Sequence, residues 1–584
     1  DYDFCEHCQA DLHALIPTRP PASCPLPDGP FALTDEQRDL LADPERTVLI
    51  PQGEDWLRLH WLDRRLDSEW RDAWAQRTAC RCDRLPQPQP LVTDEGTWII
   101  VPTKGRSSAP WSTSRHRTPL EELQQMIGFA YELAETLESL HRHNVLWMNF
   151  DPSELERDAA GRLIITNLDV RSFPFNQAPH TLAVHPAYVP PEVVYLKTAD
   201  LGPRTDVFHL AALCYYWLAG YLPGGLPGDG LEAIDFHLPP LRVYAPHLPE
   251  GMSRIIARGM APEAAHRYAT PTAFVQELKD ALERAQKRRA FTGAVAWEIG
   301  SRSIAGRTKT ALKRGNEDQA FVHRYANPER ALIAVADGIT TCDIGNGALA
   351  SFITTIVLEN AFDDSHQEDG FPEHIHAVCV RSSQTLLEWA LEKGHRDQLL
   401  QGQDLMGSTL TAGWLQGNVL QIANLGDSRA YLIEGGRIEQ LTVDGDLACD
   451  LLSQGTPPEK VREIGPMGKA LRQCIGGCDI DDEGKLATLV EATTPSMSRW
   501  PVIPGDVIVL CTDGLVEEGA FLEPELLVEI LRNHARASAQ ELAELFVDAA
   551  DSLQRLPSMM EPDGFGDNVS CVVVKITAQT QALG

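Results

Sequence analysis

The chain has 584 residues, with 51 Lys and Arg against 83 Asp and Glu, which gives a formal net charge of −32. This length predicts more than one domain, and the acidity argues against an extended surface for nucleic acid or for anionic lipid. The thirteen cysteines do not indicate a disulfide scaffold; neither a secretory leader nor an uninterrupted apolar run of membrane-spanning length is visible, so we expect a cytoplasmic protein.

Residues 1–45 form a polar, proline-containing segment in which Cys5 and Cys8 have a Cys-x-x-Cys spacing and Cys24 follows. Around Cys5 and Cys8 the sequence resembles the second half of a zinc ribbon, where two thiolates at this spacing hold one tetrahedral ion. Because such a site needs four ligands, the resemblance implies a structural Zn²⁺ completed by Cys24, by a later Cys-x-Cys pair, or by residues preceding this sequence. A pair of free thiols is the alternative.

Residues 46–285 form a second predicted domain. Its expected elements include a strand, an amphipathic helix and a long apolar helix, at residues 97–101, 121–141 and 205–218. Their order, together with Pro-Pro-Glu192 and Arg267, resembles the C-terminal lobe of a protein kinase. The resemblance implies that Glu192 and Arg267 form a structural ion pair. It also implies that the apolar stretch from Val207 is the central helix of that lobe and not a membrane span.

The kinase-like domain lacks the residues that phosphoryl transfer requires. Asn149 stands at the place of the catalytic Asp, Glu154 at that of a magnesium-binding Asn, and Asn167 at that of the metal-binding Asp. No lysine precedes Lys104, so the phosphate-anchoring Lys is also missing. The resemblance therefore implies a pseudokinase with a regulatory or substrate-docking role. Metal and nucleotide binding by a different route, through Glu154 and Asp169, is the alternative.

Beyond residue 290, apolar strand-like runs begin or end at acidic residues. A carboxylate at the end of a buried strand is costly unless a cation or a hydrogen-bond donor neutralises it. A set of oxygen ligands delivered in this way suits Mg²⁺ or Mn²⁺ rather than zinc. We therefore expect these acids to meet around hard divalent ions. They are Glu317, Asp318, Asp337, Asp427, Asp513 and Asp567.

In this order, the acids and their neighbours resemble the metal-dependent protein phosphatases (the PPM, or type 2C, family). The matching motifs are Asn316-Glu-Asp318, Val335-Ala-Asp-Gly338, Gly407-Ser-Thr409, Gly426-Asp-Ser-Arg429, Pro504-Gly-Asp506, Cys511-Thr-Asp-Gly514 and Gly566-Asp-Asn568. The resemblance implies a phosphatase domain over residues 290–579, built as an α-β-β-α sandwich. The whole chain is thus expected to be a multidomain α+β protein. Helices predicted at 347–362, 372–393 and 538–556 would lie outside the two sheets.

The family resemblance implies hydrolysis of phosphoserine and phosphothreonine by a water bound to two Mg²⁺ or Mn²⁺ ions. Asp337 would bridge both ions and the carbonyl of Gly338 would add an oxygen. Asp513 and Asp567 would bind from the other side. The remaining acids of the set would act through bound waters or at a third, weaker site, namely Glu317, Asp318 and Asp427. The phosphoprotein substrate is the expected partner, and the kinase-like domain would bind a regulatory protein.

Two positions depart from the family pattern. Lys313 stands where an Arg usually grips the phosphate, so a fork-shaped contact would depend on the adjacent Arg314. A Gly-Gly-His or His that follows Asp-Gly in many members is replaced by residues 339–343. Since neither change removes a metal ligand, we expect activity. Other acids are expected to be structural, Asp506 at a turn and Asp343, Asp444 and Asp446 at the surface or in turns.

The leading hypothesis is a metal-dependent protein serine/threonine phosphatase with an N-terminal pseudokinase. The alternative from another class is a catalytically inactive signalling scaffold that binds phosphoproteins. The retained acidic set speaks against the scaffold, because a pure binder gains nothing from keeping mutually repelling charges together. An active atypical kinase is disfavoured by the missing lysine and the two amides.

Overall fold

The protein was analysed as a computed structural model. The residues that it describes are 4–5, 10–11, 20–26, 29–41, 48–52, 55–63, 89–94, 96–103, 119–147, 155–157, 163–165, 173–174, 190–194, 201–220, 240–246, 248–249, 251–306, 310, 315–326, 329–362, 370–456, 458–480, 485–488, 493–516, 522–554 and 566–579. Several residues singled out in the sequence lie outside this set, namely Cys8, Asn149, Glu154, Asn167, Asp169, Lys313 and Arg314.

The chain divides into two compact units. Unit 1 comprises Asp1–Leu241 and Met252–Asp280, and unit 2 comprises Arg242–Gly251 and Ala281–Gly584. Each unit is described by itself, and the domain bounds expected from the sequence stay predictions.

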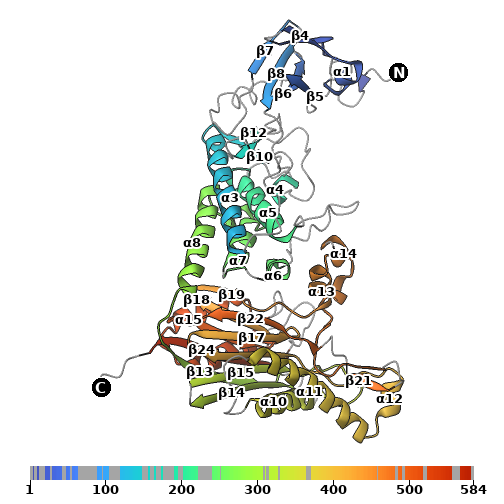
Figure 1. Cartoon of the computed structure of the whole chain (residues 1–584), viewed down its shortest axis with the longest axis vertical. Coiled ribbons are helices and arrows are strands. Elements are labelled where there is room, and N and C mark those ends of the chain that lie inside the picture. The colour runs from blue at the N-terminus through green and yellow to red at the C-terminus, as the bar shows by residue number, and fades with distance from the viewer. Residues whose placement is uncertain are drawn as a thin grey trace. The chain divides into compact units, whose positions relative to one another are not determined.

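Unit 1 combines an antiparallel four-stranded sheet, in the order β5-β6-β8-β7, with a group of helices (Figure 1). Trp61 and Trp98 meet inside the core of the sheet, with ring centroids 4.7 Å apart. The elements are β1 (Phe4–Cys5), β2 (Ala10–Asp11), β3 (Ser23–Leu26), β4 (Gly29–Ala32), α1 (Asp35–Leu41), β5 (Val48–Gln52), β6 (Asp55–Asp63), β7 (Gln89–Val92), β8 (Gly96–Thr103), α3 (Pro119–His141), β9 (Val145–Leu146), β10 (Leu155–Arg157), β11 (Leu163–Ile165), β12 (Phe173–Pro174), α4 (Pro191–Val194), α5 (Pro203–Ala219), α7 (Met252–Gly259) and α8 (Pro271–Arg289), whose last turns belong to unit 2.

Two buried polar contacts hold the helices of unit 1 in place. Arg267 donates from both terminal nitrogens to the two carboxylate oxygens of Glu192, at 2.7 and 2.9 Å, and both side chains are almost fully buried. The ion pair expected from the sequence is therefore present. Asp206, in α5, accepts hydrogen bonds from the His141 ring and from the backbone N–H of Trp147. Burial alone would raise the pKa of Asp206, but its bonds to the neighbouring imidazoles hold that pKa at about 2.

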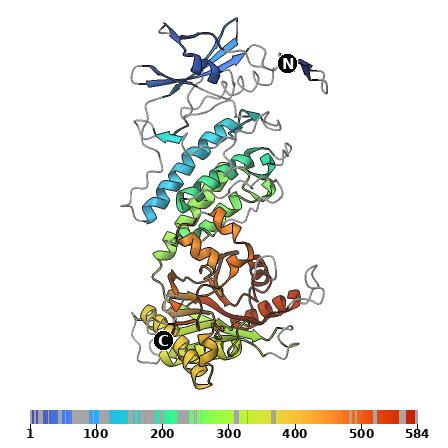
Figure 2. The same cartoon turned by 90° about the vertical axis from the view of Figure 1, so that its right-hand side faces the viewer.

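Unit 2 is built from two antiparallel five-stranded sheets, in the orders β13-β24-β23-β18-β19 and β14-β15-β16-β17-β22. Its elements are α6 (Leu241–Tyr244), β13 (Val295–Ile304), β14 (Asp318–Ala326), β15 (Glu329–Asp337), α10 (Gly347–Ala361), α11 (Phe371–Glu392), α12 (Arg396–Leu400), β16 (Leu410–Gln416), β17 (Val419–Leu425), β18 (Arg429–Glu434), β19 (Arg437–Gln440), α13 (Leu447–Ser453), α14 (Pro458–Glu463), β20 (Cys478–Ile480), β21 (Leu486–Thr488), β22 (Ser496–Pro501), β23 (Val507–Cys511), α15 (Pro524–Asn533), α16 (Ala539–Gln554) and β24 (Val569–Ala578). Figure 2 shows α10 and α11 on the outer face of the sheet that contains β14 and β15.

The central strands contain long apolar runs because each of their faces meets a different core. Along β15, Ala331, Ile333 and Val335 point into the core between the two sheets. The alternating residues Leu332 and Ala334 pack against α10 and α11 instead. This follows from the two-residue period of a strand. β23 and β24 alternate in the same way between the inter-sheet core and the core under α15 and α16. The layering agrees with the sandwich expected from the sequence.

Among the described residues, no helix is long and apolar enough to span a bilayer. The apolar stretch that begins at Val207 lies within α5, where most side chains are buried against the other helices of unit 1.

Candidate active site

The hairpin of β14 and β15 brings the first two acids together. Asp318 begins β14 and Asp337 ends β15, and the two residues are direct partners in the antiparallel register. The backbone of Asp337 is fixed by Thr409, whose hydroxyl accepts from the Asp337 N–H at 3.0 Å, and by Ser408, whose hydroxyl donates to the Asp337 carbonyl at 2.9 Å. The carboxylates of this pair therefore leave the sheet at one end, on neighbouring strands.

β23 and β24 deliver two further acids from the opposite sheet. Their last register pair is Cys511 with Cys571, so Asp513 and Asp567 lie just beyond the paired ends. Gly514 lets these segments approach, because a Cβ at this position would lie 1.9 Å from the Asn568 carbonyl oxygen. Gly514 is thus required by the close packing of these two backbone segments.

Thr512 ties the two sheets together at this point. Its hydroxyl donates to Asp318 Oδ2 at 2.9 Å and accepts from the Ser570 N–H at 3.2 Å. The sequence alone did not identify Thr512 as a site residue. Its position directly before Asp513 could have indicated it, because a hydroxyl next to one carboxylate in the sequence can donate a hydrogen bond to another carboxylate of the site.

The acids interact strongly with one another. Burial raises the pKa of Asp337 well above its ordinary value, and the charges of Asp318, Asp513 and Asp567 raise it further. Asp337 also shares a hydrogen bond with Asp513. Burial raises the pKa of Asp318 to about 7, with contributions from Asp513 and Asp567, against the lowering effect of the Thr512 hydroxyl. The four carboxylates, which come from two sheets, therefore lie close enough to interact electrostatically.

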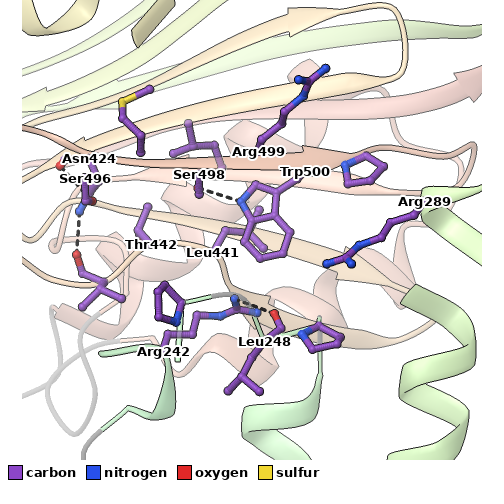
Figure 3. A pocket seen from close by; sticks show the side chains of 16 residues that line it. Arg242, Leu248, Arg289, Asn424, Leu441, Thr442, Ser496, Ser498, Arg499 and Trp500 are labelled. Carbon is purple, nitrogen blue, oxygen red and sulfur yellow. Dashed lines mark hydrogen bonds between the residues drawn. The ribbon is translucent and has the colours of Figure 1, made fainter. Parts of the chain in front are cut away.

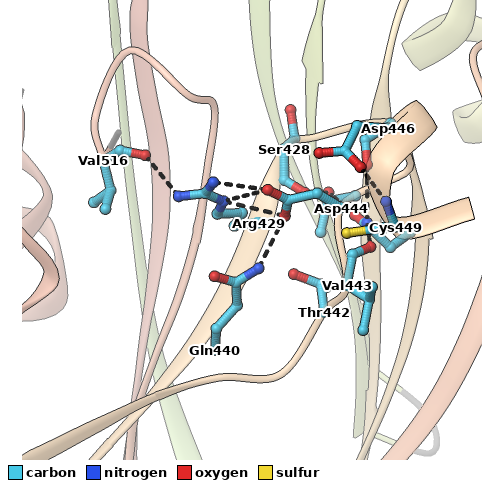
Figure 4. A network of polar contacts seen from close by, with 12 residues as sticks. Ser428, Arg429, Gln440, Thr442, Val443, Asp444, Asp446, Cys449 and Val516 are labelled. Atoms are coloured by element: carbon cyan, nitrogen blue, oxygen red, sulfur yellow. Dashed lines mark hydrogen bonds and ion pairs between the residues drawn. The ribbon is translucent and has the colours of Figure 1, made fainter. Parts of the chain in front are cut away.

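Asp427 lies at the margin of this cluster. Burial raises its pKa to about 7, and the charges of Asp513 and Asp444 add to the effect. The segment that carries Asp427 is held by an arginine fork, in which Arg429 donates to both carboxylate oxygens of Asp444 at 2.7 to 3.1 Å (Figure 4). Gln440 donates to the same carboxylate at 2.9 Å.

The expectation that Asp444 is a surface or turn acid is wrong. Its side chain is 15% exposed, because the Arg429 fork and Gln440 compensate its charge inside the domain. Asp446 instead caps α13 by accepting from the Cys449 N–H, and Asp343 is an exposed acid that accepts from the Asp404 N–H, in line with structural roles.

Asp506 is structural, as expected. Its carboxylate accepts from the Ile503 N–H at 2.9 Å and forms a buried ion pair with Arg288 at the end of α8. The acid therefore fixes the turn before β23 and anchors a helix to it.

Two other predicted site residues, Glu317 and Gly338, lie next to the clustered acids in the sequence. Glu317 is buried, and its carboxylate accepts from the Thr340 hydroxyl at 2.8 Å. Gly338 packs against Gly347, where a Cβ on Gly338 would lie 2.1 Å from the Gly347 carbonyl oxygen. The predicted phosphate-binding pair, Lys313 and Arg314, lies outside the described residues.

The donor set suits hard divalent cations. All four clustered side chains offer carboxylate oxygens, and Asp318 Oδ1 is a buried acceptor without a hydrogen-bond partner among the described residues. Among the described residues, no group of three or more His, Cys, Asp or Glu side chains is arranged so that it could already hold a metal ion. A cation between these mutually repelling groups would offset both their charge and their burial.

Cys24 is the predicted zinc ligand whose side chain the structure describes. Cys24 is fully buried in the core with Trp61 and Trp98, and burial raises the pKa of its thiol to about 12. A thiol in such an apolar setting resists the deprotonation that zinc binding requires. Because Cys8 is not described, the zinc site with Cys5 and Cys8 stays a prediction.

Comparison with known proteins relates this part of the chain to a protein family. Residues 306–554 match the model of protein phosphatase 2C. The serine/threonine protein phosphatase PstP of Mycobacterium tuberculosis is 25% identical over 283 residues, which are 48% of this chain and 46% of PstP, so the match spans about half of that relative. The serine/threonine phosphatase stp of Listeria innocua is 26% identical over 269 residues, 45% of this chain and 91% of stp.

Two solved structures of PstP are similar to this chain. The crystal structure of M. tuberculosis PstP/Ppp covers 48% of this chain and 98% of its own, at 23% identity and a TM-score of 0.35. The structure of the PstP catalytic domain in complex with two manganese ions covers 48% and 99%, at 22% identity and a TM-score of 0.34. Residues 306–554 thus match the protein phosphatase 2C family, and the curated relatives to which the chain is similar are serine/threonine protein phosphatases.

Proposed function

We propose that this chain is a Mg²⁺- or Mn²⁺-dependent protein phosphatase that hydrolyses phosphoserine and phosphothreonine. The observation that carries the proposal is the meeting of Asp318, Asp337, Asp513 and Asp567, delivered by strand ends of two sheets. A structural role does not account for this grouping, since the charges of Asp513 and Asp567 raise the pKa of both Asp318 and Asp337 and so add to the cost of burying them.

The clustered acids would hold two divalent ions. Asp337, which has acidic neighbours on both sheets, would help to hold both ions, and Asp513 and Asp567 would do so from the second sheet. Asp318 is oriented by the Thr512 hydroxyl, which leaves its other oxygen available. Asp427 would contribute to a third, weaker site. When bound, the ions supply a Lewis acid that activates water and offsets the charge of the phosphoryl oxygens.

The substrate would be a phosphoprotein. Lys313 and Arg314 are the cations that the chain offers to its phosphate, by their position before Glu317 and Asp318. Glu317, held by Thr340, would act through water rather than by direct contact.

We assign unit 1 a regulatory role as a pseudokinase. The Glu192–Arg267 ion pair is the contact that a kinase-like lobe would require, and Asn149 and Asn167 replace the carboxylates of phosphoryl transfer. A structural Zn²⁺ at Cys5 and Cys8 would stabilise the N-terminal segment.

The test is phosphate release by the full chain from peptides that carry phosphoserine, phosphothreonine or phosphotyrosine. We expect release from the first two with Mn²⁺, none in EDTA, and a loss of about 10³-fold for Asp513→Asn, since a metal centre contributes several kcal/mol to the barrier. Asp343→Asn, which changes an exposed acid of the same domain, should retain full activity. Phosphopeptide binding without release in Mn²⁺ would favour the scaffold and overturn the proposal.

A further inference from the structure

A cavity of about 210 Å³ lies in unit 2, at the edges of its two sheets (Figure 3). One wall comes from β22, the last strand of its sheet, and from β17 beside it. The other comes from residues 242–249 and from the end of α8. An apolar cavity of about 150 Å³ holds benzene, so this one has room for an aromatic ring with a small charged group.

The walls of the cavity are apolar and cationic. Trp500 and Leu248 line it together with several prolines, and Arg242, Arg289 and Arg499 contribute the only charged side chains of the described lining. In a chain with a net charge of −32, a cavity lined by arginines and by no described acid is a local exception. Such a lining favours a ligand with an apolar body and a negative group.

Arg242 is built into the floor of the cavity. Its terminal nitrogens donate to the Leu248 carbonyl at 3.1 Å and to Glu439 at 2.9 Å, and its guanidinium lies 4.8 Å from the centroid of the Trp500 ring. The side chain is almost fully buried, yet its Nε has no hydrogen-bond partner among the described residues. The contacts with Leu248, Glu439 and the Trp500 ring therefore fix Arg242 and this wall of the cavity.

Arg289 supplies a second cation at the mouth. It is exposed, and Figure 3 shows its side chain extending from the end of α8 toward Trp500. Arg499 instead points away from Arg242 and Arg289 in the same view, as expected for a strand residue next to the inward-facing Trp500. The two arginines that face the cavity are therefore Arg242 and Arg289.

We propose that this cavity is a binding site for a small aromatic or heterocyclic phosphate or carboxylate. The ring would lie against Trp500 and Leu248, and the anionic group would accept hydrogen bonds from Arg289. The site is separate from the acidic cluster, whose four carboxylates would repel the same ligand when no metal is bound.

Binding is tested on the full chain in EDTA by calorimetry with phenylphosphonate, a non-hydrolysable probe. Benzylamine and benzyl alcohol serve as cationic and neutral probes of similar shape. We expect saturable binding of phenylphosphonate only, weakened about tenfold or more in Arg289→Gln, because a charged hydrogen bond contributes about 1.5–3 kcal/mol. The matched variant Arg499→Gln should bind within about twofold of the wild type, since that side chain points away.

Three results would overturn the site: no saturable binding, equal binding of benzylamine, or equal weakening by Arg289→Gln and Arg499→Gln.

Discussion

Neutralising a carboxylate of the acidic cluster should stabilise the metal-free protein. Asp318→Asn keeps the shape of the side chain and the oxygen that accepts from Thr512, but removes one of four mutually repelling charges. A surface acid would show no such effect, and an acid with a structural cation partner would show the opposite one. The direction of the change in stability therefore distinguishes an acid of a metal-binding cluster from a surface acid and from an acid paired with a structural cation.

The pKa of Asp318 sets the size of the effect. Burial and its acidic neighbours raise that pKa from 3.8 to about 7, so ionising the folded, metal-free side chain costs roughly 4 kcal/mol more than ionising the unfolded one. The buried amide of Asn retains part of the desolvation cost, so about 2 kcal/mol should be recovered above pH 7. This corresponds to a rise of about 4–8 °C in the melting temperature of the domain.

The assay is scanning calorimetry of the full chain at pH 8, in EDTA and in Mn²⁺, on the transition that Mn²⁺ shifts in the wild type. Asp318→Asn should melt higher than the wild type in EDTA and gain less from Mn²⁺. Asp506→Asn is the matched control, because Asp506 is an equally buried acid paired with Arg288. It should lower stability by roughly 3–5 kcal/mol in both conditions. A lower melting temperature for Asp318→Asn in EDTA, or an undiminished gain from Mn²⁺, would refute the reasoning.

Three further predictions concern charge and its compensation. Arg429→Lys loses the fork on Asp444, so we expect a loss of about 1–3 kcal/mol in the free energy of unfolding, seen in urea titrations, and a higher Mn²⁺ requirement for activity. Because the folded pKa values of Asp318 and Asp427 lie near 7, above the unfolded values, the metal-free chain holds extra protons between about pH 4 and 7. Its melting temperature should therefore fall as pH rises through that window and stay level when saturating Mn²⁺ is present; a rise in EDTA would contradict the assignment. Arg267→Lys loses one of two bonds to a buried carboxylate and should cost about 1–3 kcal/mol in unit 1, measured by its thermal transition, whereas an unchanged transition would show that the ion pair contributes nothing.

Much of the C-terminal half could be predicted from the sequence because its signals are local. The segments that form β15, β23 and β24 are mostly apolar, and their acids stand at or beside the strand ends, so strand and candidate ligand are read from the same residues. The alternation of β15 between two cores explains why the run has no polar face. The turns between β16 and β17 and between β18 and β19 were likewise marked by Gly417 and by Gly435 and Gly436.

Interactions between distant segments could not be predicted. The partnership of Arg429 with Asp444 depends on how two loops fold toward each other, and Asp444 alone has the sequence of an ordinary turn acid. The contact of Arg242 with Glu439 joins residues 197 positions apart and has no local signal. For the same reason the cavity beside Trp500, which these segments enclose, could be found only in the folded chain.

The kinase-like interpretation depends on one ion pair and on two amides in place of carboxylates, and the zinc interpretation depends on the N-terminal cysteines. Glu192 and Arg267 pair as the resemblance implied, because both belong to elements that pack in unit 1. The missing carboxylates at Asn149 and Asn167 are properties of the sequence itself. Cys24, by contrast, points into an apolar core, a placement that its spacing from Cys8 could not indicate.

The central claim is that acids from two sheets hold divalent cations. Its most direct test is the number of Mn²⁺ ions bound by the full chain, measured by calorimetry and by electron paramagnetic resonance, in the wild type and in Asp337→Asn. We predict at least two bound ions in the wild type, with spin coupling between them, and loss of the coupled pair in Asp337→Asn. A wild type that binds no Mn²⁺, or an Asp337→Asn variant that keeps the coupled pair, would contradict the account.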